Sequence, residues 1–127
     1  NFNFIGDLNK DFRINDRTFA CKGNTKDFIW LSYKDFFRQN LAISDFLAIC
    51  EKYNWFFIDD FEQNDDYGKD IIRRFIGFID IAYIEKVKIK FFFNSDDIRS
   101  LYIGEELSFL WDRTISRLEE MQNINDK

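Results

Sequence analysis

A change of hydrophobic period within residues 70–94 constrains the fold of this chain more than any other feature. Over residues 70–84 the apolar side chains recur at spacings of three and four, which places them on one face of a helix. Over residues 87–93 apolar positions alternate along the chain, which is the two-residue period of a strand. A second apolar run, residues 55–58, precedes the helix. Strand, helix, strand is a βαβ unit, and it predicts two parallel strands with the helix lying across them. The residues on the expected helix face are Ile72, Phe75, Ile76, Ile79 and Tyr83.

The N-terminal part of the chain is expected to add a short hairpin to this α/β core. We expect residues 1–16 to be an irregular segment that docks on the domain, and residues 17–127 to form one domain. Strands at 18–22 and 28–31, joined by a turn at Gly23-Asn24, would make the hairpin.

Additional helices are expected before and after the βαβ unit in the sequence. Ser32 stands where a helix N-cap would stand, which predicts a short helix ending near Gln39. A second helix is expected over residues 44–53 and a third over residues 111–123. Residues 62–69 are polar and are expected to be a loop.

Composition limits the classes of function. The net charge is -5 and the isoelectric point is near 4.8, which argues against broad, charge-driven nucleic-acid binding. There is no His, and Cys21 and Cys50 are the two cysteines, so neither a zinc site of the usual kind nor a His-based catalytic triad is expected. We expect both thiols to be reduced and partly buried. No apolar run approaches the ~20 residues that a membrane helix needs, and no secretory signal opens the chain.

The run of four apolar residues before Asp59-Asp60 is one candidate for chemistry. In P-loop ATPases such a strand ends in acids that hold Mg²⁺ and polarise water. The simpler interpretation is a buried strand that enters a solvated acidic loop, and we favour it because the sequence contains no Gly-x-x-x-x-Gly-Lys-Ser/Thr motif to cradle phosphates.

Four arginines are the second candidate, because a guanidinium can stabilise charge on a phosphoryl group. The alternative is ion pairing, since Arg117 has Asp112 and Glu120 within helical reach. Asp80 lies mid-helix beside the apolar face, and we expect it to be a buried partner of one of the arginines. The pair Glu119-Glu120 is expected to be a solvated helix face. The four arginines are Arg73, Arg74, Arg113 and Arg117.

Several motifs in order resemble the ZapE/Afg-like P-loop ATPases. The run Arg73-Arg74-Phe75-Ile76-x-x-Ile79-Asp80-x-x-Tyr83-x-x-x-Val87-Lys88 is similar to that family's "RRFIxLIDxLYxxxVKL". Residues 112–122 resemble its "ERTxSRLxEMQS", Leu101-Tyr102 matches its "LY", residues 43–49 are similar to its "SAADYLALA", and residues 28–37 resemble a strand followed by "FxELC". The order and spacing agree from about residue 17 to residue 123. The sequence departs from the family pattern at Asp59-Asp60-Phe61, where the family often has Pro.

The resemblance implies the C-terminal part of an ATP-hydrolysing motor that acts on a protein client, in cell division or in membrane-protein quality control. The first residue is Asn, and we expect the chain to be a piece of a longer protein whose preceding part carries the Walker A motif. ATP and Mg²⁺ are then expected for the parent protein and no cofactor for this chain alone. Carried over to matched positions, Arg74, Arg113 and Arg117 are the candidates for contact with the γ-phosphate or with a neighbouring subunit's nucleotide, and Asp80 would orient an arginine.

The resemblance also implies partners and a location. We expect association with the rest of the ATPase or with other subunits, a protein client and no nucleic acid. The expected location is the cytoplasm of a bacterium, with peripheral contact to the inner membrane, or a mitochondrion in a eukaryote. The alternative function is a non-catalytic protein-interaction module that lacks a P-loop.

Overall fold

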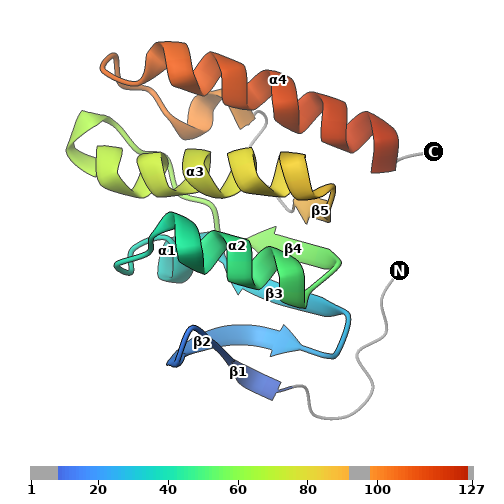
Figure 1. Ribbon diagram of the computed structural model, residues 1–127. Coiled ribbons are helices and arrows are strands. Elements are labelled where there is room, and N and C mark those ends of the chain that lie inside the picture. The colour runs from blue at the N-terminus through green and yellow to red at the C-terminus, as the bar shows by residue number, and fades with distance from the viewer. Residues whose placement is uncertain (1–8, 92–97, 126–127) are drawn as a thin grey trace.

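The structure, a computed structural model, describes residues 9–91 and 98–125, and within them the chain forms a mixed five-stranded sheet with four α-helices (Figure 1). The strand order is β1-β2-β3-β4-β5, so each strand pairs with its neighbours in the sequence. The strands are β1 Asn9–Ile14, β2 Arg17–Asn24, β3 Phe28–Ser32, β4 Trp55–Asp59 and β5 Lys88–Phe91. The helices are α1 Tyr33–Phe36, α2 Ile43–Lys52, α3 Lys69–Glu85 and α4 Ser108–Asn125, with short 3-10 turns η1 Asp66–Gly68 and η2 Ile98–Leu101.

The first three strands form an antiparallel meander. β2 and β3 are the expected hairpin, but Gly23 and Asn24 belong to β2 and the turn occupies residues 25–27. The expectation that residues 1–16 are irregular is wrong for residues 9–14, which form β1 and pair antiparallel with β2. Asn15 and Asp16 join these strands with φ angles of 50° and 63°, the left-handed conformation that tight hairpin turns require and that Asn and Asp tolerate.

The βαβ unit is confirmed. β4 pairs parallel with both β3 and β5, and α3 lies between β4 and β5 in the chain. α3 ends where Lys86 takes a φ of 60° and its N–H reaches the carbonyl of Ala82, a left-handed C-cap that turns the chain into β5. The expected strand over 87–93 begins at Lys88, and its last two residues lie outside the described part of the chain.

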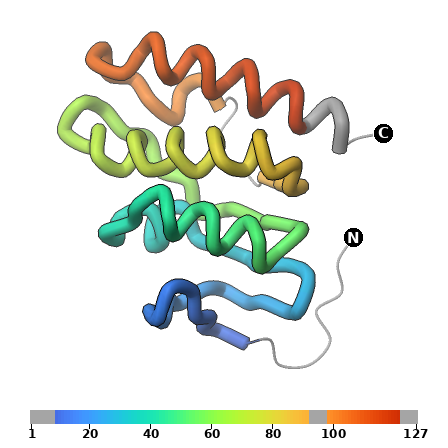
Figure 2. The backbone as a smooth tube through the Cα atoms, viewed as in Figure 1, coloured from blue at the N-terminus to red at the C-terminus, as the bar shows by residue number. Residues whose placement is uncertain are grey.

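The core lies between the sheet and the helix layer formed by α1, α2 and α3. Figures 1 and 2 show these helices side by side on one face of the sheet, with α4 beyond α3 at the β5 edge. The expected inner face of α3 is confirmed for four of its five residues, while Tyr83 is half-buried at the margin. Aromatic rings fill the layer, and Phe37 contacts the rings of Phe75 and Phe78 at centroid distances of 5.3 and 5.6 Å.

The polar loop between β4 and α3 is tied to the start of α4. Asn64 is buried, forms a parallel bridge with Tyr102 and accepts a hydrogen bond of 2.8 Å from the Tyr33 hydroxyl. The Asp66 carboxylate accepts hydrogen bonds from the N–H groups of Glu105 and Glu106 and from the Tyr102 hydroxyl. These bonds satisfy backbone donors near the start of α4, and the helix begins at Ser108, three residues before the predicted start.

No helix in the described residues is long and apolar enough to cross a bilayer.

Candidate functional site

Asp80 lies between two arginines of α4. The Arg113 Nη2 atom is 3.2 Å from Asp80 Oδ2, and the Arg117 Nη1 atom donates to Asp80 Oδ1. The apolar side of α4, including Ile115 and Leu118, packs inward, and this orientation turns the two arginines toward α3. The structure therefore brings three of the four candidate site residues together.

This cluster of Asp80, Arg113 and Arg117, hereafter the arginine cluster, carries an excess of positive charge. Each arginine contacts a different carboxylate oxygen, so one negative charge is shared by two positive ones. The side chains of Arg113, Asp80 and Arg117 are 45%, 29% and 27% exposed. Partial exposure leaves the guanidiniums open to an anion that approaches from solvent, and a guanidinium fork suits carboxylate or phosphate oxygens.

Tyr83 and Glu120 extend the cluster along the α3–α4 contact. The Arg117 guanidinium lies over the Tyr83 ring, 5.0 Å from its centroid, an arrangement that favours a cation. The Tyr83 hydroxyl donates to Glu120 at 2.8 Å, and this bond raises the pKa of Tyr83. The prediction that Arg117 pairs with Glu120 or Asp112 of its own helix is wrong, because its partner among the described residues is Asp80.

Sequence reasoning missed the roles of Tyr83 and Glu120, although their spacing offered a signal. Tyr83 follows Asp80 by three residues and Glu120 follows Arg117 by three, so each lies on the face of its helix that carries the ion pair. From the sequence alone, Tyr83 is expected in the buried stripe and Glu120 on a solvated face.

Arg74 does not join the arginine cluster. Six positions separate it from Asp80 on α3, which places the two about 120° apart around the helix axis. Its Nη1 atom donates to the carbonyl of Phe37 at the end of α1, at 3.2 Å. Arg73 is exposed and lies 3.5 Å from Asp70.

The two acids at the carboxyl end of β4 share one lysine side chain, that of Lys22 in β2. The Lys22 ammonium lies 2.9 Å from an oxygen of Asp59 and 2.9 Å from an oxygen of Asp60. The hydrogen bond from Lys22 lowers the pKa of Asp60 below its usual value. Asp60 has a φ of 56°, and Lys22 also lies over the Trp30 ring.

The residues of this chain do not fit Mg²⁺–ATP by themselves. The two carboxylates that could ligate the ion are already paired with Lys22, and no phosphate-cradling motif exists in the sequence. In residues 9–91 and 98–125, no group of three or more His, Cys, Asp or Glu side chains could hold a metal ion.

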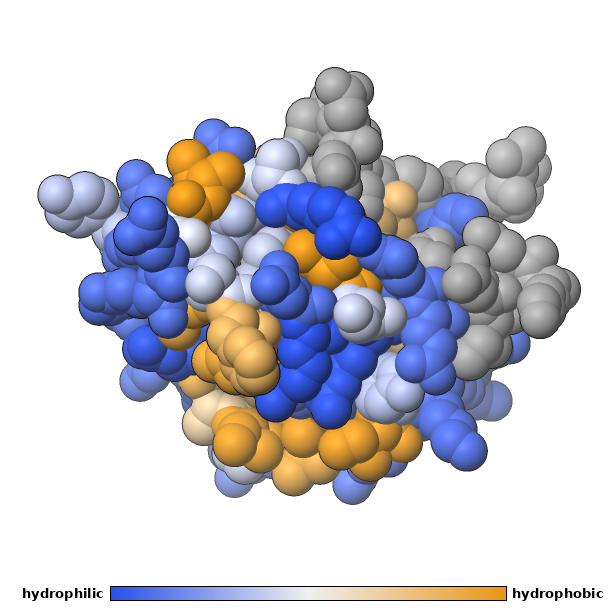
Figure 3. All heavy atoms as spheres, turned by 90° about the horizontal axis from the view of Figure 1, so that it is seen from above, coloured by the Kyte–Doolittle hydropathy of each residue, from blue (hydrophilic) through white to orange (hydrophobic). Residues whose placement is uncertain are grey.

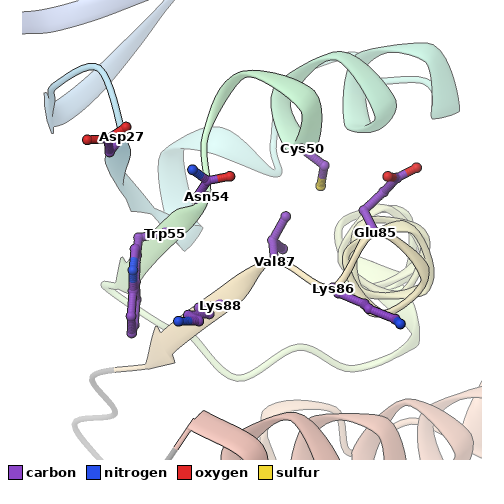
Figure 4. Close-up of a pocket in the computed structure, with 8 residues that line it drawn as sticks. All are labelled: Asp27, Cys50, Asn54, Trp55, Glu85, Lys86, Val87 and Lys88. Atoms are coloured by element: carbon purple, nitrogen blue, oxygen red, sulfur yellow. The ribbon is translucent and has the colours of Figure 1, made fainter.

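A pocket of about 530 Å³ opens at the amino ends of β4 and β5 (Figure 4). Glu85, Lys86 and Lys88 contribute to its wall, and Cys50 of α2 points toward Val87. Burial raises the pKa of the Cys50 thiol to about 12, so the thiol is protonated at neutral pH and is not an activated nucleophile. Burial also raises the pKa of Cys21.

A comparison with protein families matches residues 7–126 to the family described as AFG1-like ATPase. No curated protein and no solved structure matches the chain.

Proposed function

The chain belongs to the AFG1-like ATPase family, and from that premise we propose that it forms the C-terminal part of an ATP-hydrolysing motor that acts on a protein client. The parent protein would bind ATP and Mg²⁺ through residues that this chain does not contain. More specifically, we propose that the motor acts on a client in cell division or in membrane-protein quality control. The protein would then lie in the cytoplasm or in a mitochondrion, with peripheral contact to a membrane.

The observation that carries the site assignment is the positive excess of the arginine cluster. Two partly exposed guanidiniums share one carboxylate, so an additional anion could be accommodated without breaking both ion pairs. We assign Arg113 and Arg117 to contact with the phosphates of a nucleotide bound elsewhere in the motor. Asp80 is a positioning residue, because it holds the two guanidiniums side by side.

Arg74 is assigned to a separate contact. It lies on another side of α3 and is anchored by one hydrogen bond to Phe37, so it cannot share one phosphate with the cluster while both retain these positions. If both groups act on nucleotide, we propose that one acts within its own subunit and the other on a neighbour. This arrangement requires self-association of the motor.

ATP turnover by the parent protein tests the assignment. Arg117→Ala, Arg113→Ala and Arg74→Ala should each lower kcat by about 100-fold or more if the arginine stabilises charge on the transferring phosphoryl group. Asp80→Asn should reduce kcat less and leave the KM for ATP nearly unchanged, because it acts through the arginines.

Arg38→Ala is the matched control. Arg38 is 51% exposed and pairs with Glu62, outside the arginine cluster. Its removal should leave turnover unchanged. An unchanged kcat in all three arginine variants, with a lower melting temperature, would make the arginines structural and withdraw the assignment.

A non-catalytic interaction module is the second candidate. Within this chain Lys22 pairs with both acids at the end of β4, and the sequence has no phosphate-cradling motif, as is expected of a module that works without nucleotide. The two functions are distinguished by measuring ATP binding to the protein translated from the longest reading frame that contains this chain. Absence of nucleotide binding there would support the interaction module.

A further inference from the structure

A groove of about 420 Å³ separates the start of α2 from the first half of α3. Its lining is mostly apolar and includes Leu41, Ile43, Phe46 and Gly77. Gly77 has no side chain to cover the Phe46 ring, and a Cβ there would stand 3.4 Å from that ring. Gly77 and the edge of the otherwise buried Phe46 ring thus lie side by side in the wall of the groove.

The surface beside this groove is also apolar. Ile43 and Leu47 lie four positions apart on α2 and are 64% and 38% exposed, so they share one face. Figure 3 shows apolar side chains gathered along its lower edge, the side on which Figure 1 shows the helix layer. A groove with an apolar strip beside it is the kind of surface that receives the apolar face of a helix.

The rim of the groove is positively charged. Arg73, Arg74 and Asp70 are the charged residues of the lining, which leaves one net positive charge in a chain whose net charge is -5. Arg73 is 58% exposed and its distance of 3.5 Å from Asp70 is long for a charge-assisted hydrogen bond. Charge complementarity therefore favours an acidic partner at this rim.

We propose that the groove between α2 and α3, together with Ile43 and Leu47, is a docking site for an amphipathic protein helix with acidic residues at one end. One apolar side chain of that helix enters the groove beside Gly77. Others rest on Ile43 and Leu47, and a carboxylate meets Arg73. This inference requires no nucleotide and leaves Arg113 and Arg117 unused, and although Arg74 counts toward the charge of the rim, the tests below change Arg73 and Gly77, which the proposed ATPase role does not use.

The first test uses the chain as it is and a pair of synthetic peptides. One is a short amphipathic helix with Leu at spacings of three and four and with Glu at one end; the other carries Lys in place of Glu. Backbone amide shifts report where each peptide binds. We expect the acidic peptide to shift residues of α2 and Gly77, with an affinity at least about 10-fold higher than that of the basic peptide, or about 1.4 kcal/mol.

Two variants test the groove itself. Gly77→Met places a side chain beside Phe46 and should lower the affinity of the acidic peptide by about 10-fold or more. Arg73→Glu should reverse the preference between the two peptides, and it decides the matter if Gly77→Met does not fold. Phe109→Ser is the matched control, because Phe109 is an apolar residue of α4 that is 82% exposed and does not line the groove.

Several results would overturn the proposal. Equal binding of both peptides would remove the charge argument. Shifts confined to Ile103 and Phe109, two exposed apolar residues outside the groove, would move the site elsewhere. No binding of the acidic peptide at millimolar concentration would reject the groove as a helix site. Binding to vesicles of anionic lipid without binding to either peptide would assign the surface to a membrane instead.

Discussion

Two charge clusters in this protein have opposite composition. In the arginine cluster two cations share the carboxylate of Asp80. At the carboxyl end of β4 two carboxylates share the ammonium of Lys22. Each cluster satisfies its central group and leaves an excess of one sign, positive in the first case and negative in the second.

The comparison shows why a charged residue is a weak guide to function until its partners are known. Asp59 and Asp60 follow an apolar strand, as Mg²⁺ ligands often do, but their cation comes from β2 in the adjoining hairpin. The arginines of α4 have acids within reach on their own helix, but they pair with Asp80 of α3. In both cases the deciding partner is distant in the sequence.

The largest expected effect on stability comes from removal of Lys22, the cation that Asp59 and Asp60 share. Lys22→Met leaves Asp59 and Asp60 without their shared partner, and Asp59 Oδ1 is already buried without a hydrogen bond to any described residue. We expect the free energy of unfolding at pH 7 to fall by about 1–2 kcal/mol. Urea denaturation measures it, and an unchanged midpoint would show that Lys22 contributes nothing to stability.

Removal of the charge of Asp80, the anion that Arg113 and Arg117 share, should destabilise the protein less, because the arginine cluster is partly exposed. Asp80→Asn should lower the free energy of unfolding by about 1 kcal/mol or less. A double-mutant cycle with Arg117→Gln isolates the coupling between the two side chains. A coupling of zero would mean that the ion pair does not stabilise the α3–α4 contact.

The smallest expected effect is a dependence on pH of the stability that the pair of Lys22 and Asp60 contributes. Because Lys22 lowers the pKa of Asp60 below 3.8, the resulting stabilisation is complete above that value and is lost as the pH falls through the folded-state pKa. The difference in stability between the wild-type protein and Lys22→Met should therefore shrink below about pH 4. A difference that grows on acidification would contradict this sign.

The sequence predicted the parts of the fold that depend on local periodicity. The apolar stripe from Ile72 to Ile79 and the alternation from Val87 predicted α3 and β5, and Ser32 does cap α1 by accepting a hydrogen bond from the N–H of Asp35. β1 was missed because its burial pattern alternates only in its second half, at Phe12 and Ile14. The Asn15-Asp16 pair, which marks the hairpin turn, was not recognised.

The sequence predicted less of the candidate site. It suggested that Asp80 would pair with an arginine, but not that Arg113 and Arg117 would both do so while Arg74 lies elsewhere. Which side chains meet depends on the packing angle between α3 and α4. That angle cannot be predicted from the spacing of residues within a single helix. The groove beside Gly77 likewise depends on where Phe46 of α2 comes to lie.

The left-handed turn at Asn15 and Asp16 has a consequence for the order of folding. It joins β1 to β2 with two residues, whereas β4 and β5 can pair only after the whole of α3 has closed the loop between them. Short hairpins form in about 1–10 µs, while pairing across long crossovers is slower. In pulse-labelling hydrogen exchange during refolding, the amides of the first hairpin should become protected before those shared by β4 and β5.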